Sequence, residues 1–208
     1  MTKVKICGIT NLEDALLASD LGADELGFNF YEKSKRYISP DEARILLDGL
    51  NRPIRKIGVF VNALLEDIFF ACDLGKLDAI QLHGDETPEF ISEVRRSTDT
   101  MIIKAIRVRS GSDIADMERF GADAILLDTY ILGERGGTGE TFDWNNAKGT
   151  RGKVSHIYLA GGLTPGNVIA AIRMVRPSAV DVASGVESEP GKKDPEKLKA
   201  FIENAKTA

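Results

Sequence analysis

Eight short apolar segments recur along the chain, separated by longer stretches in which apolar residues follow a helical spacing. The apolar segments are rich in Ile, Val, Leu and Phe, and most lack the polar alternation of a half-exposed strand. Continuous apolar runs of this length are typical of strands buried on both faces, as in parallel sheets. We therefore predict eight strands, at residues 4–7, 25–30, 56–61, 79–83, 101–108, 124–128, 155–160 and 179–183.

The segments between these runs predict amphipathic helices. Residues 11–21 carry apolar side chains at helical spacing after a candidate N-cap at Thr10 or Asn11. Ser39-Pro40 and Thr164-Pro165 each place a capping residue before a proline suited to the first helical turn. The other expected helices lie at residues 64–74, 88–96, 112–120 and 195–205.

A weak internal repeat supports eight strand-helix units. Gly22, Gly75 and Gly121 each precede an even-numbered strand, where a helix C-terminus favours a left-handed residue. Such alternation predicts a parallel sheet, either a closed barrel or a doubly wound open sheet. The first turn, residues 7–10, lacks the Gly-x-Gly-x-x-Gly pattern of a Rossmann sheet, which favours the barrel.

The length fits this architecture. Eight units in 208 residues leave about 26 residues for each, close to the lower size limit of such barrels. No linker-like composition divides the chain. We predict a single (β/α)8 TIM barrel domain of near-minimal size over residues 1–208.

Composition excludes several other functions. The 27 Lys and Arg against 32 Asp and Glu give a net charge of −5 without a basic stripe, so we expect no nucleic-acid binding. Two cysteines are too few for a disulfide framework, which favours a reducing, cytoplasmic location. No signal peptide is apparent, and no apolar stretch approaches the roughly 18 residues of a membrane span.

Polar residues at the predicted strand ends are the candidates for chemistry, because barrels place their active sites there. Cys7 ends the first strand, where a thiol with a lowered pKa acts as a base or a nucleophile. Asp128 ends the sixth strand and is a candidate general acid or base. Cys72 lies in a helical apolar stretch and is assigned to packing. His83 is interpreted as a strand-end histidine and is not assigned to catalysis.

Two glycine turns predict a phosphate site. Gly161 and Gly162 follow the seventh strand, and Ser184 and Gly185 follow the eighth. Glycines let the backbone approach an anion and direct its N–H groups at it, and these two loops form phosphate sites in many barrels. Residues 136–139, with three glycines, predict a mobile loop that is either a lid or a flexible linker.

Arg36 has two readings. Its guanidinium suits bidentate binding of a carboxylate. With Lys33 and Lys35 nearby, it also fits a solvated basic loop.

A series of motifs in order along the chain resembles the phosphoribosylanthranilate isomerase family of tryptophan biosynthesis. The resemblance covers essentially the whole sequence, and two segments, KICG at residues 5–8 and GGTG with FDW at residues 136–144, are highly specific together. The other motifs are GFNF at residues 27–30, GVFV at 58–61, QLHG at 81–84, LD at 127–128, AGGL at 160–163 and DVASGVE at 181–187.

The resemblance implies an Amadori rearrangement of N-(5-phosphoribosyl)anthranilate that needs neither a metal nor a cofactor. It implies that Cys7 is the general base and Asp128 the general acid. Arg36 would hold the anthranilate carboxylate and Asp181 a polar group of the substrate. The phosphate would bind the backbone amides around Gly161, Gly162, Ser184 and Gly185. Many relatives have Ser-Pro-Arg in the second loop, whereas this chain has Ser-Lys-Arg at residues 34–36.

Two other functions stay open at this point. The first is another phosphate-binding barrel enzyme, although a related sugar isomerase of histidine biosynthesis typically carries Asp at the position of Cys7, and metal-dependent epimerases need more histidines than His83 and His156. The remaining alternative is a barrel that binds phosphosugars without catalysis. The expected partner is a small phosphorylated molecule, and the protein is expected to be a monomer or a homodimer.

Overall fold

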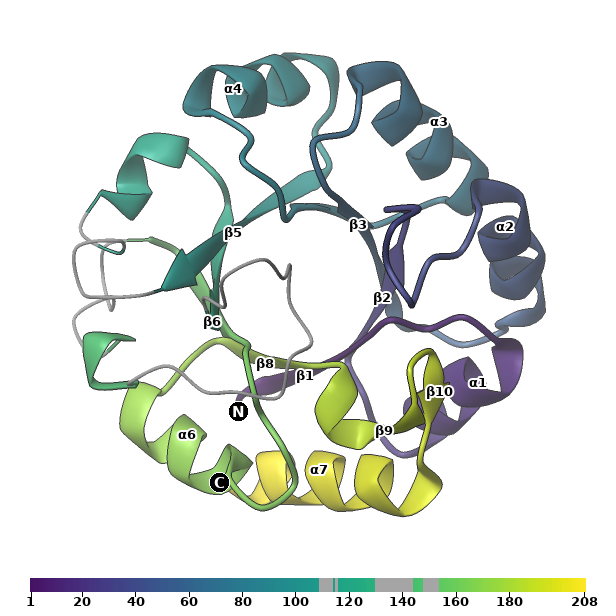
Figure 1. Ribbon diagram of the computed structural model, residues 1–208, viewed down its shortest axis with the longest axis vertical. Helices are drawn as coiled ribbons and strands as arrows, with labels where there is room; N and C mark the ends of the chain where they lie inside the picture. Colours follow the sequence, from purple (N-terminus) through teal and green to yellow (C-terminus); the bar gives the residue numbers. More distant parts are fainter. Residues whose placement is uncertain (109–113, 115, 130–143, 148–153) are drawn as a thin grey trace.

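Eight parallel strands form a closed barrel in the computed structural model of the chain, with the helices arranged around its outside (Figure 1). The structure describes residues 1–108, 114, 116–129, 144–147 and 154–208. The first strand pairs with both the second and the eighth, so the sheet has no edge and the open-sheet alternative is excluded. The predicted barrel is confirmed.

The strands follow the predicted apolar segments to within two residues at each end. They are β1 (Lys3–Cys7), β2 (Glu25–Asn29), β3 (Arg55–Phe60), β4 (Ala79–Leu82), β5 (Met101–Val108), β6 (Ala124–Thr129), β7 (His156–Leu159) and β8 (Ala179–Val182). The helices are α1 (Leu12–Asp20), α2 (Pro40–Gly49), α3 (Leu65–Gly75), α4 (Pro88–Ser97), α6 (Val168–Val175) and α7 (Pro195–Thr207). Short 3-10 turns are η1 (Met117–Phe120), η2 (Trp144–Ala147) and η3 (Ser184–Val186), and a small hairpin joins β9 (Glu187–Glu189) to β10 (Lys192–Lys193).

Capping residues decide where several helices begin. Asn11 caps α1 by accepting a hydrogen bond from the Asp14 amide, and Ser39 forms a capping box at the start of α2.

The prediction that a helix begins at Thr164-Pro165 is wrong. The Asn167 side chain accepts a hydrogen bond from the Thr164 amide and donates one to the carbonyl of Gly162. These bonds hold a turn there, and α6 begins only after it, at Val168.

Of the three glycines expected in a left-handed conformation before even-numbered strands, two have it. Gly22 has φ 96° and Gly121 has φ 59°. The third expectation is wrong, because α3 continues through Gly75 and Lys76 takes the left-handed conformation with φ 47°. Of the helix expected at residues 112–120, the described residues show a helical residue at Ile114 and the 3-10 turn η1, and residues 109–113 and 115 lie outside the described residues.

Two apolar layers hold the strands in place. Inside the barrel, side chains such as Ile57, Ile103 and Leu126 are buried against one another. Outside it, residues such as Leu26 and Phe201 are buried between strands and helices. These layers leave the carboxyl ends of the strands free to carry polar residues. In the described part of the chain, no helix is long and apolar enough to span a membrane.

Candidate active site

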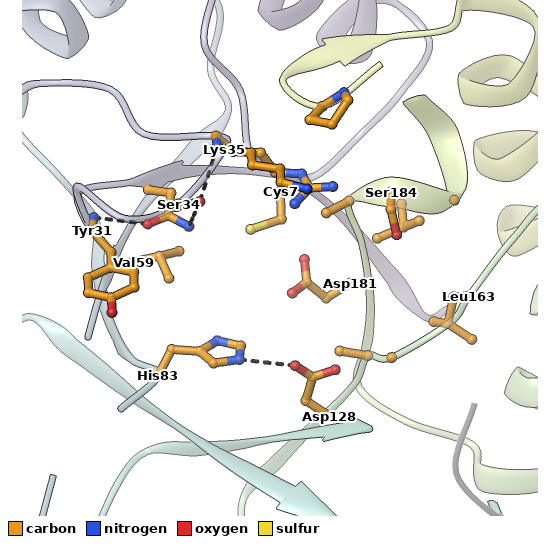
Figure 2. A pocket seen from close by; sticks show the side chains of 18 of the residues that line it. Cys7, Tyr31, Ser34, Lys35, Val59, His83, Asp128, Leu163, Asp181 and Ser184 are labelled. Atoms are coloured by element: carbon orange, nitrogen blue, oxygen red, sulfur yellow. Dashed lines mark hydrogen bonds and ion pairs between the residues drawn. The ribbon is translucent and has the colours of Figure 1, made fainter. Parts of the chain in front are cut away.

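The carboxyl ends of the strands surround a cavity of about 490 Å³, as expected for this fold. Figure 2 shows the side chains of Cys7, His83, Asp128 and Asp181 arranged around the same space, each from a different strand end. Every site residue predicted from the sequence lines this cavity. These residues are Cys7, Arg36, Asp128, Gly161, Gly162, Asp181, Ser184 and Gly185.

Cys7 ends β1 beside Gly27, its partner in β2. A Cβ at Gly27 would lie 2.8 Å from the Cys7 sulfur and 3.2 Å from Lys5 Nζ. Any residue larger than glycine at this position would therefore crowd both groups. Burial raises the pKa of the Cys7 thiol, while the ammonium groups of Lys5 and Lys193 act to lower it. Nearby charge therefore tunes the proton affinity of this thiol.

A buried ion pair lies below the thiol. The Lys5 ammonium, which is fully buried, lies 3.0 Å from Oδ1 of Asp181. Burial acts to lower the pKa of Lys5, but the Asp181 carboxylate and other neighbouring groups raise it more, so the lysine is charged. Sequence reasoning assigned Asp181 to the substrate and missed Lys5. The available signal was the two-residue period of a strand, which directs Lys5 and Cys7 to the same side of β1.

Asp128 is held by a chain of side chains that begins at Gln81. The Gln81 amide nitrogen lies 2.8 Å from Nδ1 of His83, and Nε2 of His83 lies 3.0 Å from Oδ2 of Asp128. When the Gln81 amide donates to Nδ1, the ring carries its proton on Nε2, and this N–H donates a hydrogen bond to Oδ2 of Asp128. His83 was not assigned to catalysis from the sequence, yet it lines the cavity in contact with the predicted acid.

Arg36 extends from the loop after β2 toward the cavity, whereas Lys33 and Lys35 are exposed at the cavity rim. Its Nε and Nη2 donate to the two carboxylate oxygens of Glu187, at 2.8 and 2.7 Å. The loop departs from the Ser-Pro-Arg pattern, but Ser34 stabilises it: the Ser34 hydroxyl oxygen accepts hydrogen bonds from the Arg36 amide and the Asn29 side chain. The structure therefore favours the interpretation of Arg36 as a residue of the candidate site over that of a solvated loop residue.

The two glycine turns pack against neighbouring backbone without room for side chains. Gly161 and Gly162 have φ angles of 81° and 64°, which favour glycine. A Cβ at Gly161 would collide with Thr129, and one at Gly185 would collide with the carbonyl oxygen of Leu163. At the glycines of these turns no side chain separates the backbone from the cavity, an arrangement suited to an anion.

Two expectations about other groups belong with this site. The predicted loop at residues 136–139 lies outside the described residues. Within the described ranges, no three His, Cys, Asp or Glu side chains gather in a way that would hold a metal ion.

Comparisons with known proteins agree with this geometry. Residues 4–204 match the family described as N-(5'phosphoribosyl)anthranilate (PRA) isomerase. A protein of Citrifermentans bemidjiense named N-(5'-phosphoribosyl)anthranilate isomerase is 49% identical over 206 residues, which cover 99% of this chain and 98% of that one.

Solved structures are similar over the full length. The crystal structure of phosphoribosyl anthranilate isomerase from Thermotoga maritima has a TM-score of 0.93 at 45% identity and covers 100% of both chains. A second isomerase structure, in complex with reduced 1-(o-carboxyphenylamino)-1-deoxyribulose 5-phosphate, has a TM-score of 0.90 at 44% identity with the same coverage. Because the family match and these relatives span nearly the whole sequence, the chain belongs to the N-(5'-phosphoribosyl)anthranilate isomerase family.

Proposed function

We propose that this protein converts N-(5'-phosphoribosyl)anthranilate into 1-(2-carboxyphenylamino)-1-deoxyribulose 5-phosphate, a step of tryptophan biosynthesis. The observation that carries the proposal is that a thiol and a carboxyl group, Cys7 and Asp128, line one cavity together with two glycine turns and an arginine. This set matches the demands of the reaction, which needs an acid, a base, an anion site and a carboxylate site. Membership of the family supports the same activity.

The first step assigned to the site is opening of the ribose ring. The Asp128 carboxyl group donates a proton to the ring oxygen, the C1–O bond breaks, and the aniline nitrogen supplies the electron pair that forms an iminium ion at C1. A general acid is needed because an alkoxide is a poor leaving group at neutral pH. The contact of Asp128 with His83, at 3.0 Å, supports this role because it holds the carboxyl group in one orientation.

The second step is removal of the proton from C2. The Cys7 thiolate accepts this proton, the C2–H electrons form a C1–C2 double bond, and the iminium ion becomes a neutral enolamine. Proton transfer from the C2 hydroxyl group to C1 then gives the aminoketose, so no atoms are gained or lost overall. Lys5 supports the thiolate form because its ammonium lowers the pKa of Cys7 against the effect of burial.

Binding is assigned to the remaining residues of the cavity. The phosphate is placed at the backbone of Gly161, Gly162, Ser184 and Gly185, because these residues line the cavity and glycine lets an anion approach backbone N–H groups. The carboxylate of the anthranilate ring is placed on Arg36, the cation of the second loop that lines the cavity and is only 14% exposed. Asp181 is assigned to a polar group of the ribose, through the oxygen that Lys5 does not bind.

The direct test is an assay with purified protein, without added metal, that follows the loss of substrate fluorescence. We expect turnover that is lost in Cys7→Ala and retained in Cys72→Ala, the matched control on α3. A wild-type protein that binds the substrate but does not turn it over would contradict the proposal and favour a non-catalytic phosphosugar-binding barrel.

Location and assembly follow as part of the same proposal. We place the protein in the cytoplasm, because both cysteines are free and the proposed chemistry needs Cys7 reduced. The working form is a monomer or a homodimer, and light scattering coupled to size-exclusion chromatography distinguishes the two.

A further inference from the structure

A cluster of three charges lies beside the cavity, where Glu187 and Lys193 of the β9–β10 hairpin meet Arg36 of the loop after β2. Arg36 binds Glu187 side-on through Nε and Nη2, and the side chain of Glu187 is only 4% exposed. None of the steps above uses Glu187.

Lys193 is the third member of the cluster. Its ammonium is fully buried, lies 3.0 Å from Oε1 of Glu187, and donates to the carbonyl oxygen of Cys7 at 2.6 Å. The hairpin itself is fixed to α1 and to the loop before it, since the Lys193 amide donates to Asp14 and the Thr10 hydroxyl donates to the Gly191 carbonyl. One lysine thus connects the support of Arg36 to the end of the strand that carries Cys7.

The geometry leaves one side of the guanidinium for a ligand. Glu187 accepts hydrogen bonds from the guanidinium edge formed by Nε and Nη2 of Arg36. In the described part of the chain, no group accepts a hydrogen bond from Nη1. Nη1 and the outer hydrogen of Nη2 form a second pair of parallel donors, which suits another carboxylate. Arg36 also lies tightly against the backbone of Gly8, where a Cβ would collide with its side chain. Its orientation is therefore fixed on two sides.

The charges of the cluster decide how strongly that free edge attracts an anion. Glu187 alone would cancel the charge of Arg36, and a neutral pair in a buried site attracts a carboxylate weakly. Although burial acts to raise the pKa of Glu187, Arg36 and Lys193 hold it below its usual range, so the carboxylate is charged. Burial lowers the pKa of Lys193, and the neighbouring Glu187 carboxylate acts against that effect. A protonated Lys193, 3.0 Å from Glu187, adds one positive charge and brings the cluster to +1.

We propose that Glu187 and Lys193 are positioning residues, which aim the free edge of Arg36 and keep the cluster at one net positive charge, so that it binds the single carboxylate of the substrate. Glu187 supplies the orientation, and Lys193 restores the charge that Glu187 removes. This inference rests on the proposed function, because it takes the anthranilate carboxylate as the ligand of Arg36.

The central test compares two single variants with the double variant. Lys193→Met leaves a cluster of zero net charge, and we expect KM to rise about tenfold or more, in line with the cost of losing one partner of a buried charge pair. Glu187→Gln keeps one acceptor for Arg36. The double variant, E187Q/K193M, returns the cluster to +1, so we expect its KM to lie well below that of Lys193→Met. A purely structural role predicts the opposite order, because the double variant loses more contacts.

Two further measurements separate charge from folding. Lys192→Met is the matched control, since Lys192 lies beside Lys193 in β10 but is exposed, and its KM should equal that of the wild type. The inhibition constant of inorganic phosphate should change less than about twofold in Lys193→Met, because phosphate is assigned to the glycine turns. Lys193→Arg keeps the charge and should retain most of the affinity.

The outcomes distinguish this inference from the proposed function. If the wild-type protein does not isomerise the substrate, the proposed function fails. If it does, but KM is unchanged in Lys193→Met, or the double variant binds substrate no better than Lys193→Met, the charge cluster has no role in binding. An equal loss of affinity for phosphate and substrate in Lys193→Met would likewise overturn the inference.

Discussion

The imidazole Nε2 of His83 lies 3.0 Å from Oδ2 of Asp128, although the two residues come from different strand ends and are separated by 45 positions. Oδ1 of the same carboxyl group accepts the Thr129 amide at 2.8 Å. Both oxygens of Asp128 are therefore held, and its orientation toward the cavity is fixed on two sides (Figure 2). This fixed orientation bears directly on how well Asp128 transfers a proton.

Replacement of His83 should lower kcat more than it changes KM. In His83→Ala the carboxyl group of Asp128 loses one of its two anchors, and we expect kcat to fall about 10- to 100-fold, within the range of positioning effects. Steady-state kinetics measure the two constants separately. A kcat within about twofold of the wild type would show that the contact does not assist the acid.

Removal of either proposed proton-transfer group should have a larger effect. Cys7→Ala and Asp128→Ala should each lower turnover about 100-fold or more, the usual contribution of a positioned acid or base. Thermal unfolding of each variant checks that the barrel remains intact. Near-normal turnover in a folded variant would remove that residue from the mechanism.

The pH dependence should report the charges around Cys7. In the proposed mechanism the thiolate is the active form, and burial raises the pKa of the thiol, so kcat/KM should increase with pH until the thiol is ionised. Lys5→Met removes a charge that lowers this pKa, and the rise should move to higher pH. Asp181→Asn removes a charge that raises it, and the rise should move to lower pH.

Alkylation by iodoacetamide measures the same ionisation without catalysis. A Cys72→Ala background leaves Cys7 as the only thiol; burial raises the pKa of Cys72 itself to about 12. The pH at which alkylation of Cys7 reaches half of its maximal rate should shift in opposite directions in Lys5→Met and Asp181→Asn. Shifts of the same sign in both variants would contradict the proposed electrostatic control.

The glycine turns should be needed for affinity to phosphate. Inorganic phosphate should inhibit competitively with the substrate, and Gly185→Ala should weaken that inhibition about tenfold or more. The added methyl group collides with the Leu163 carbonyl and forces the two turns apart, at a stability cost of about 1–3 kcal/mol. Gly166→Ala is the matched control, because the nearest atom to its Cβ is 3.8 Å away. Inhibition that is not competitive would contradict the assigned phosphate site.

The sequence-based predictions that failed have two physical causes, one local and one tertiary. The start of α6 was misplaced because a side-chain hydrogen bond of Asn167 holds a turn where local propensity favours a helix beginning at proline. The end of α3 was misplaced because Lys76 takes the left-handed conformation that local propensity assigns to glycine. His83 was set aside because a lone strand-end histidine carries no signal of its own. Its contact with Asp128 appears only once the barrel brings the ends of β4 and β6, which are not adjacent in the sheet, toward the same cavity.

The sequence by itself determined the barrel and the strand ends that carry chemistry. Eight apolar runs with helical segments between them have few packing solutions, and parallel strands bring residues such as Cys7 and Asp128 to the same end. Only the tertiary structure decided which charges meet. Lys5 and Asp181 are 176 positions apart, and Arg36 and Glu187 are 151 apart. Closure of the barrel places β8 beside β1, and no local pattern in the chain encodes pairs that depend on that closure.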